Sequence, residues 1–144
     1  MLFFVCDAAF HKADATHFFD GLKMKVLIVD DSKVARMSLG RLIHSLADGY
    51  VIDEAKDVPS GLDVVASGLP DIAIIDLNMP GPDGLVLIES LIEKGMAADR
   101  LAVLTANIQS SVRARVEALG VTFIAKPASS EALRAFMNQT SEVG

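Results

Sequence analysis

The chain has 144 residues, of which 51% are hydrophobic and 22% charged, so it can form one compact domain with its own apolar core but has no room for a second. Its formal net charge of −6 argues against a surface that binds nucleic acid or anionic membranes through general attraction to phosphate groups. Cys6 is the only cysteine, which excludes an internal disulfide and a four-cysteine zinc site and leads us to expect a reducing, cytoplasmic setting.

The first 23 residues differ in character from the rest of the chain. They hold five of the seven phenylalanines and end just before a second methionine, Met24, where the first strand-like segment begins. Asp7 interrupts the initial apolar run too early for a signal peptide, and no apolar run approaches the roughly 18 residues of a membrane-spanning helix. We expect residues 1–23 to form an N-terminal extension, poorly ordered or appended to the domain, and residues 24–144 to form the domain itself.

From Met24 onward, short apolar segments rich in valine and isoleucine alternate with longer segments of helical periodicity. Strands are predicted at 25–30, 50–54, 71–76, 100–104 and 121–125, and helices at 33–47, 58–67, 84–94, 108–119 and 129–139. The first predicted helix has one apolar face that can pack on a sheet, formed by Ala35, Leu39, Leu42, Ile43 and Leu46. Glycines that accept a positive φ angle follow four of the helices: Gly49, Gly68, Gly95 and Gly120.

Five successive units of strand and helix predict an α/β fold with a parallel sheet, because each right-handed crossover returns the chain parallel to the previous strand. The segments VLIV, IAII and LAVL are apolar at every position, which is typical of strands that helices cover on both faces. In open sheets of this kind, ligands bind beyond the carboxyl ends of the strands. A functional site is therefore expected at that edge.

Polar side chains stand at the carboxyl ends of four of the five predicted strands. The first strand ends in Asp30 and Asp31, the third ends in Asp76, Thr105 follows the fourth, and the fifth leads into Lys126. Each residue alone has an ordinary explanation, such as a helix cap or a solvated side chain. Together on one edge, they indicate a functional site.

The chemistry that these side chains support is phosphoryl transfer. Three carboxylates that gather at one edge repel one another, and Mg²⁺ would offset this repulsion while leaving coordination positions for phosphate oxygens. Lys126 adds a positive charge suited to a phosphoryl oxygen. Asp76 is the candidate nucleophile because Asp30 and Asp31 are needed to hold the ion, and Thr105 can donate a hydrogen bond to the attached phosphoryl group.

The motifs that contain these residues resemble the receiver domains of bacterial two-component response regulators, among them the stand-alone chemotaxis-type regulators. The motifs are VDDS at 29–32, DLNMPGPDG at 76–84, LTA at 104–106 and KP at 126–127, and the resemblance spans about residues 24–140. It implies a flavodoxin-like, doubly wound sheet of five parallel strands in the order 2-1-3-4-5.

The resemblance also implies roles for the site residues. Asp30, Asp31 and Asp76 would be ligands of Mg²⁺ together with the backbone carbonyl of Asn78, and Asp76 would also be the phosphoacceptor. Lys126 would bind the phosphoryl group. The residues that would flank this group and set its lifetime are Asn78 and Asn107.

Three further residues would take part in the switch or shape the site. Thr105 would be the switch hydroxyl and Phe123 the switch aromatic. Phe123 precedes Lys126 by three residues on one strand, so it should project to the opposite face, toward the helix predicted at 108–119. Pro127 would follow a cis peptide bond and fix a tight turn that aims Lys126 inward.

By this resemblance the protein would be a phosphorylation-dependent signalling switch rather than an enzyme, although it would catalyse its own phosphorylation and dephosphorylation. The phosphoryl donor would be a sensor histidine kinase or a phosphotransfer protein. Only TSEVG follows the last predicted helix, so we expect output through a protein that contacts the fourth helix, the fifth strand and the fifth helix. No contact with nucleic acid and no membrane insertion is expected.

Two alternatives within the same fold stay open: an adaptor that acts without phosphorylation, and a phosphate sink that drains a kinase. A phosphohydrolase of the haloacid dehalogenase type would also use an aspartate nucleophile on a parallel sheet. That mechanism needs a second aspartate two residues after the nucleophile, where this chain has Asn78. The sequence therefore favours the receiver.

Overall fold

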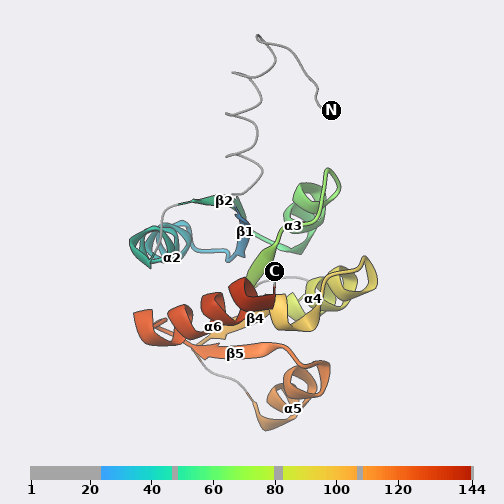
Figure 1. The fold of residues 1–144 in the computed structure, drawn as a ribbon. Helices are drawn as coiled ribbons and strands as arrows, with labels where there is room; N and C mark the ends of the chain where they lie inside the picture. Colours follow the sequence, from blue (N-terminus) through green and yellow to red (C-terminus); the bar gives the residue numbers. More distant parts are fainter. Residues whose placement is uncertain (1–23, 47–48, 80–82, 107–108, 144) are drawn as a thin grey trace.

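The computed structural model describes residues 24–46, 49–79, 83–106 and 109–143 (Figure 1). The predicted extension over residues 1–23 and the candidate residue Asn107 lie outside these ranges. Five parallel strands form one sheet in the order β2-β1-β3-β4-β5. This order confirms the predicted flavodoxin-like fold. The strands are β1 (Met24–Val29), β2 (Tyr50–Ala55), β3 (Ile72–Asp76), β4 (Leu101–Thr105) and β5 (Thr122–Ala125).

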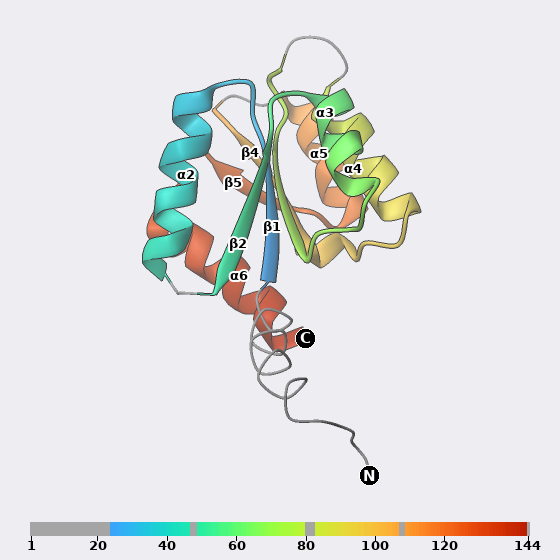
Figure 2. The same cartoon turned by 90° about the horizontal axis from the view of Figure 1, so that it is seen from above.

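Helices cover both faces of the sheet: α2 and α6 lie on one face, and α3, α4 and α5 lie on the other (Figure 2). A short 3₁₀ helix, η1 (Ala98–Arg100), precedes β4. None of the described helices is both long and apolar enough to cross a lipid bilayer. The helices are α2 (Lys33–Leu46), α3 (Val58–Val65), α4 (Gly84–Glu93), α5 (Ser110–Leu119) and α6 (Ser130–Val143).

The predicted boundaries lie within two residues of the observed ones except at the end of α6, which was predicted at 139 and extends to Val143. Among the residues of α6 whose burial the structure describes, which end at residue 139, Met137 is the last buried apolar one. Residues 138–143 contain no glycine or proline, so nothing in the sequence ends the helix at residue 139. The four glycines predicted to follow helices all have positive φ angles; Gly120, for example, ends α5 at φ 80°.

The core consists of two apolar layers, one on each face of the sheet. Side chains along a strand alternate between faces, so Leu27 and Val29 pack with α3, α4 and α5, whereas Val26 and Ile28 pack toward α2 and α6. All four side chains are at most 1% exposed. Burial on both faces explains why the central strands are apolar at every position.

The parallel register brings the carboxyl ends of the strands to one edge of the sheet. Val29 pairs with Ala55, Asp76 with Leu104, and Thr105 with Ala125, so the strands end close to the same level. The segments that follow β1, β3, β4 and β5 therefore leave the sheet side by side.

Helix α4 starts very close to the end of β3, and Gly84 makes this approach possible. A Cβ atom added at Gly84 would lie 2.6 Å from the backbone oxygen of Asp76 and 2.8 Å from Cγ2 of Ile75. Asp83 caps the helix, because its carboxylate accepts hydrogen bonds from the backbone N–H groups of Leu85 and Val86. The missing side chain thus allows the first turn of α4 to pack directly against Asp76.

Replacing Gly84 with alanine is expected to lower the free energy of unfolding by roughly 1–3 kcal/mol, because the new methyl group must displace the backbone of β3. Gly40→Ala in the middle of α2 is the control, since the added carbon would be 3.6 Å from Ile52 Cδ1, an ordinary contact. There, alanine should raise the free energy of unfolding by up to about 1 kcal/mol. Urea unfolding followed by circular dichroism measures both changes. A Gly84→Ala protein as stable as the wild type would contradict the packing argument.

Candidate functional site

Three carboxylates meet at the carboxyl edge of the sheet. Asp30 and Asp31 follow β1 directly, and Asp76 is the last residue of β3, the neighbour of β1. One carboxylate oxygen from each residue lies within 4.8 Å of the others. Asp30 and Asp76 are each 3% exposed, whereas Asp31 is exposed. The cluster is thus buried on one side and open to solvent on the other.

Lys126 reaches this cluster from the end of β5. Its Nζ atom lies 2.9 Å from Oδ2 of Asp30 and 3.3 Å from Oδ2 of Asp76. The backbone N–H of Lys126 donates a hydrogen bond to the carbonyl oxygen of Thr105, which fixes the start of its side chain relative to β4. The peptide bond between Lys126 and Pro127 is cis. One ammonium group therefore contacts two of the three carboxylates.

Asn78 connects the acidic cluster to the buried hydroxyl group of Thr105. Its backbone N–H donates to Oδ1 of Asp76 at 3.0 Å, and its side-chain Nδ2 donates to Oγ1 of Thr105 at 2.6 Å. Thr105 is only 1% exposed. The predicted roles of Asn78 did not include this link, because the two residues are 27 positions apart and only the pairing of β3 with β4 brings them together.

The charges of the site influence one another strongly. Burial raises the pKa of Asp76, and the nearby charge of Asp30 raises it further. The hydrogen bond from Asn78 and the positive charge of Lys126 lower this pKa but do not outweigh the burial. Burial alone would lower the pKa of Lys126, but its contacts with Asp30 and Asp76 outweigh this effect and raise it, so the ammonium form is favoured. One ammonium group cannot balance three carboxylates, and the cluster therefore favours a further cation.

The donor atoms suit a hard divalent cation such as Mg²⁺. All three side chains of the cluster offer carboxylate oxygens, which Mg²⁺ prefers, and exposed Asp31 leaves the cluster accessible from solvent. Within the described residues, neither histidine nor cysteine, the usual ligands of zinc, belongs to this cluster. The residues present thus fit the predicted magnesium site.

Phe123 lies on the opposite face of β5 from Ile124 and packs beneath α5. Its side chain joins the apolar layer of α3, α4 and α5, whereas Ile124 joins the layer of α2 and α6. The guanidinium carbon of Arg113, on α5, is 4.6 Å from the centroid of the Phe123 ring, close enough for a cation–π interaction. The ring therefore faces the helix toward which it was predicted to project; its switch role stays a prediction.

Arg36, in the first turns of α2, is a residue of the site that the sequence motifs do not reveal. Its guanidinium donates to the backbone oxygen of Asp30 at 2.7 Å and binds the carboxylate of Glu54 at 2.8 Å. Arg36 precedes the buried residues Leu39 and Ile43 by three and seven positions, so it shares their face of the helix. An arginine on the buried face of a helix is the one sequence signal that could have indicated these contacts.

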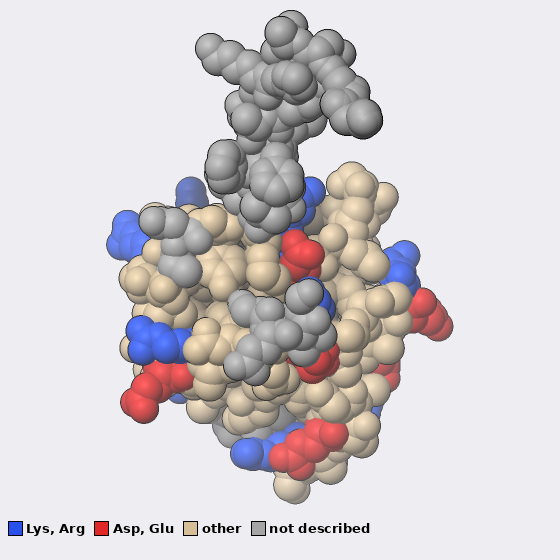
Figure 3. All heavy atoms as spheres, in the orientation of Figure 1, with Lys and Arg blue, Asp and Glu red and all other residues tan. Residues whose placement is uncertain are grey.

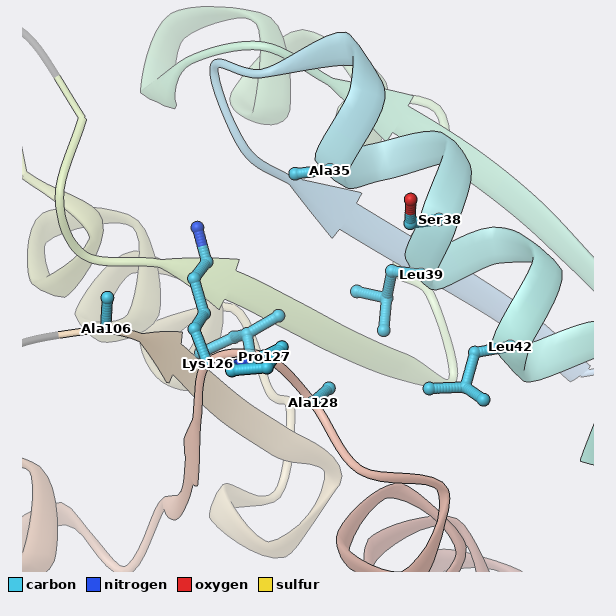
Figure 4. Close-up of a pocket in the computed structure, with 9 residues that line it drawn as sticks. Ala35, Ser38, Leu39, Leu42, Ala106, Lys126, Pro127 and Ala128 are labelled. Atoms are coloured by element: carbon cyan, nitrogen blue, oxygen red, sulfur yellow. The ribbon is translucent and has the colours of Figure 1, made fainter.

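A mostly apolar cavity of about 360 Å³ lies beside the site, between α2 and the segment that joins β5 to α6 (Figure 4). Ser38 and Lys126 supply its polar side chains, and the lysine extends along one side of it. Its other lining residues are Ala35, Leu39, Leu42, Leu104, Ala106, Pro127 and Ala128. Lys126 therefore borders both the cavity and the acidic cluster.

Known proteins of similar sequence identify the family. The sequence profile of the response regulator receiver domain matches residues 26–138, which include the acidic cluster, Thr105 and Lys126. The chain belongs to this family. Receiver domains are signalling modules of two-component systems; they bind Mg²⁺ at an acidic cluster and interact with histidine kinases or phosphotransfer proteins.

The curated relatives are longer proteins. Response regulator MprA of Mycobacterium avium (strain 104) is 35% identical over 117 residues, which are 79% of this chain and 49% of the relative. Response regulator MprA of Mycobacterium sp. (strain KMS) is 32% identical over 127 residues, which are 83% of this chain and 53% of the relative. The receiver chain thus spans about half the length of the curated relatives it matches.

Solved structures support the fold of the receiver domain. The receiver domain of a DNA-binding response regulator from Colwellia psychrerythraea 34H superposes with a TM-score of 0.74 at 24% identity, over 83% of this chain and 99% of that one. The chemotaxis protein CheY4 of Vibrio cholerae gives a TM-score of 0.71 at 24% identity, over 82% and 98% of the two chains. At this identity the likeness establishes the fold alone.

Asp76→Asn is expected to stabilise the metal-free receiver at neutral pH, because it removes a carboxylate charge that burial disfavours, as the raised pKa of Asp76 indicates. A raised pKa means that the folded protein binds the proton more tightly than the unfolded chain does. The wild type therefore regains stability on acidification. The difference in the free energy of unfolding between the wild type and Asp76→Asn should shrink as the pH falls toward about 4.

Urea unfolding in the presence of EDTA, at neutral and at acidic pH, measures this difference. Asp63→Asn on the exposed side of α3 is the control for the change in net charge. A variant at Asp76 that is less stable than the wild type at neutral pH would contradict the expectation.

Proposed function

We propose that the protein is a magnesium-dependent phosphorylation switch whose phosphoacceptor is Asp76. The observation that carries this proposal is that buried Asp76 shares one cluster with two further carboxylates and contacts the ammonium group of Lys126. The nucleophile, the metal-binding oxygens and a cation for the phosphoryl group are then within reach of one another.

Asp30, Asp31 and Asp76 would hold the magnesium ion, together with the backbone carbonyl of Asn78. When bound, the ion supplies positive charge that offsets the carboxylates and the charge on the phosphoryl oxygens. Lys126 supplies a second positive charge, and Nζ lies 3.3 Å from Oδ2 of Asp76, where it could bind an oxygen of the attached phosphoryl group.

The reaction would move a phosphoryl group from its donor to a carboxylate oxygen of Asp76. That oxygen provides the electron pair of the new O–P bond, while the bond between phosphorus and the donor breaks and its electrons remain on the donor. With phosphohistidine the leaving imidazole takes up a proton from solvent; with acetyl phosphate the leaving group is acetate. Hydrolysis of phospho-Asp76 would reset the switch, at a rate that Asn78 and Asn107 would influence.

The switch would act through Thr105 and Phe123. The phosphoryl group adds nearly two negative charges at the sheet edge, and the hydroxyl of Thr105 could exchange its hydrogen bond from Asn78 for one to a phosphoryl oxygen. A shift of β4 at Thr105 would alter the packing of Phe123 beneath Arg113. The proposed output surface is therefore the face formed by α5, β5 and α6.

The proposed donor is a cytoplasmic histidine kinase or phosphotransfer protein, and the proposed target is a protein. Lysine and arginine side chains lie interspersed with acidic ones on the face shown in Figure 3, and the net charge of −6 disfavours general attraction to nucleic acid. Residues 24–144 would form the switch, with residues 1–23 as an appended extension. Pro127 would keep the turn that directs Lys126 toward Asp76.

Intact-protein mass spectrometry after incubation with acetyl phosphate tests the phosphoacceptor. We expect the wild type to gain one phosphoryl group only when Mg²⁺ is present and Asp76→Asn to gain none, because the amide is no nucleophile. Asp63→Asn should behave like the wild type. Phosphorylation of the Asp76→Asn protein, or phosphorylation unaffected by EDTA, would contradict the proposal.

Capture of partner proteins by the phosphorylated and the unmodified chain distinguishes the switch from the alternatives. A target bound only by the phosphorylated form supports the switch. A target bound equally by both forms supports the adaptor instead, and rapid loss of the phosphoryl group with no target supports the phosphate sink.

A further inference from the structure

We propose that Arg36 is a positioning residue that aligns Asp30 and Asp31 for the binding of a divalent cation. This inference rests on the proposed function, because it assumes that the acidic cluster holds the ion. By this inference, residues of α2 and of the edge strand β2 help to fix the geometry of the metal site.

Arg36 binds two different parts of the protein at once. Its Nη1 atom donates to the backbone oxygen of Asp30 at 2.7 Å, and its Nε atom donates to Oε1 of Glu54 at 2.8 Å. The side chain of Arg36 is only 14% exposed, while that of Glu54 is 43% exposed. The planar guanidinium group can make both contacts because its donors form a rigid fork, which the single ammonium group of lysine cannot reproduce.

The other polar groups of Asp30 are also held in place. Its backbone N–H donates to the oxygen of Ala55 at 3.1 Å, its Oδ1 accepts from the N–H of Ser32 at 2.9 Å, and its Oδ2 accepts from Lys126. The contact with Arg36 adds the backbone oxygen to this set. The structure thus fixes Asp30 through its main chain as well as its side chain.

The contact with the backbone oxygen of Asp30 also determines where Asp31 lies. The carbonyl group of Asp30 belongs to the same planar peptide unit as the N–H and the Cα atom of Asp31. A change in the ψ angle of Asp30 would turn this peptide unit and move Asp31 with it, so that the exposed carboxylate of Asp31 would shift relative to Asp30 and Asp76. By holding the carbonyl oxygen, Arg36 opposes this rotation.

Glu54 keeps the guanidinium group in the orientation that this contact requires. It lies on β2 and pairs in register with Ile28 of β1, two residues before Asp30. Groups that orient the ligands of a metal typically change its affinity roughly 10–100-fold when they are removed. If Arg36 only linked α2 to β2, its loss would instead reduce the stability of the fold and leave the affinity for the ion unchanged.

The test measures binding of Mn²⁺, as a probe of the divalent site, by isothermal titration calorimetry on the unphosphorylated full chain. Arg36→Gln is expected to raise the dissociation constant of Mn²⁺ roughly tenfold or more. Arg41→Gln is the matched control, because Arg41 is an exposed arginine on the same helix and its loss changes the net charge equally. The Arg41→Gln protein should bind Mn²⁺ with the same dissociation constant as the wild type.

A second readout is the concentration of Mg²⁺ that gives half-maximal phosphorylation by acetyl phosphate. Arg36→Gln should require more Mg²⁺ while the rate at saturating Mg²⁺ approaches that of the wild type, because the nucleophile and Lys126 are intact. Arg36→Lys and Glu54→Gln should also weaken Mn²⁺ binding. These two variants keep the proposal testable even if Arg36→Gln does not fold.

Two results overturn the inference alone: an Arg36→Gln protein with reduced stability but wild-type affinity for Mn²⁺, or an Arg36→Lys protein with wild-type affinity. In both cases the wild type binds the ion and is phosphorylated, so the proposed function stands. A wild type that neither binds Mn²⁺ nor accepts a phosphoryl group overturns the proposed function and this inference together.

Discussion

The repulsion between carboxylates at one edge of the sheet is the constraint on which the rest of the site depends. Asp30 and Asp76 are both buried, and the charge of Asp30 adds to the burial that raises the pKa of Asp76. The fold tolerates them because it supplies Lys126 from a strand that is distant in sequence. A cluster that is short of positive charge favours the binding of a cation.

The sheet supplies this arrangement without long loops. Parallel strands deliver their carboxyl ends to one edge, where the last residues of β3 and β4 and the segments directly after β1 and β5 carry the polar side chains. Close packing then fixes their relative positions, as at Gly84, where α4 touches the backbone of Asp76. The geometry of the acidic cluster thus depends on the scaffold together with side-chain contacts such as that of Arg36 with the backbone of Asp30.

Much of this architecture could be predicted from the sequence, because apolar strands and amphipathic helices alternate clearly. The polar residues at the strand ends also follow from local pattern, and the structure brings Asp30, Asp31, Asp76 and Lys126 together. The hydrogen bond from Asn78 to Thr105 and the contacts of Arg36 could not be predicted in this way. They depend on which strands are neighbours and on side-chain orientation; for Arg36 the sequence shows only that it shares the buried face of α2, not which groups it contacts.

The division of the core into two layers has a consequence for how the molecule can change. Phe123 and Ile124 are adjacent in sequence but belong to apolar layers on opposite faces of the sheet. Side chains around α5 can therefore repack while those beneath α2 keep their places. Over evolution, substitutions can then accumulate around α5 while the side chains beneath α2 keep their packing. The sheet thus allows the sequences on its two faces to vary independently of each other.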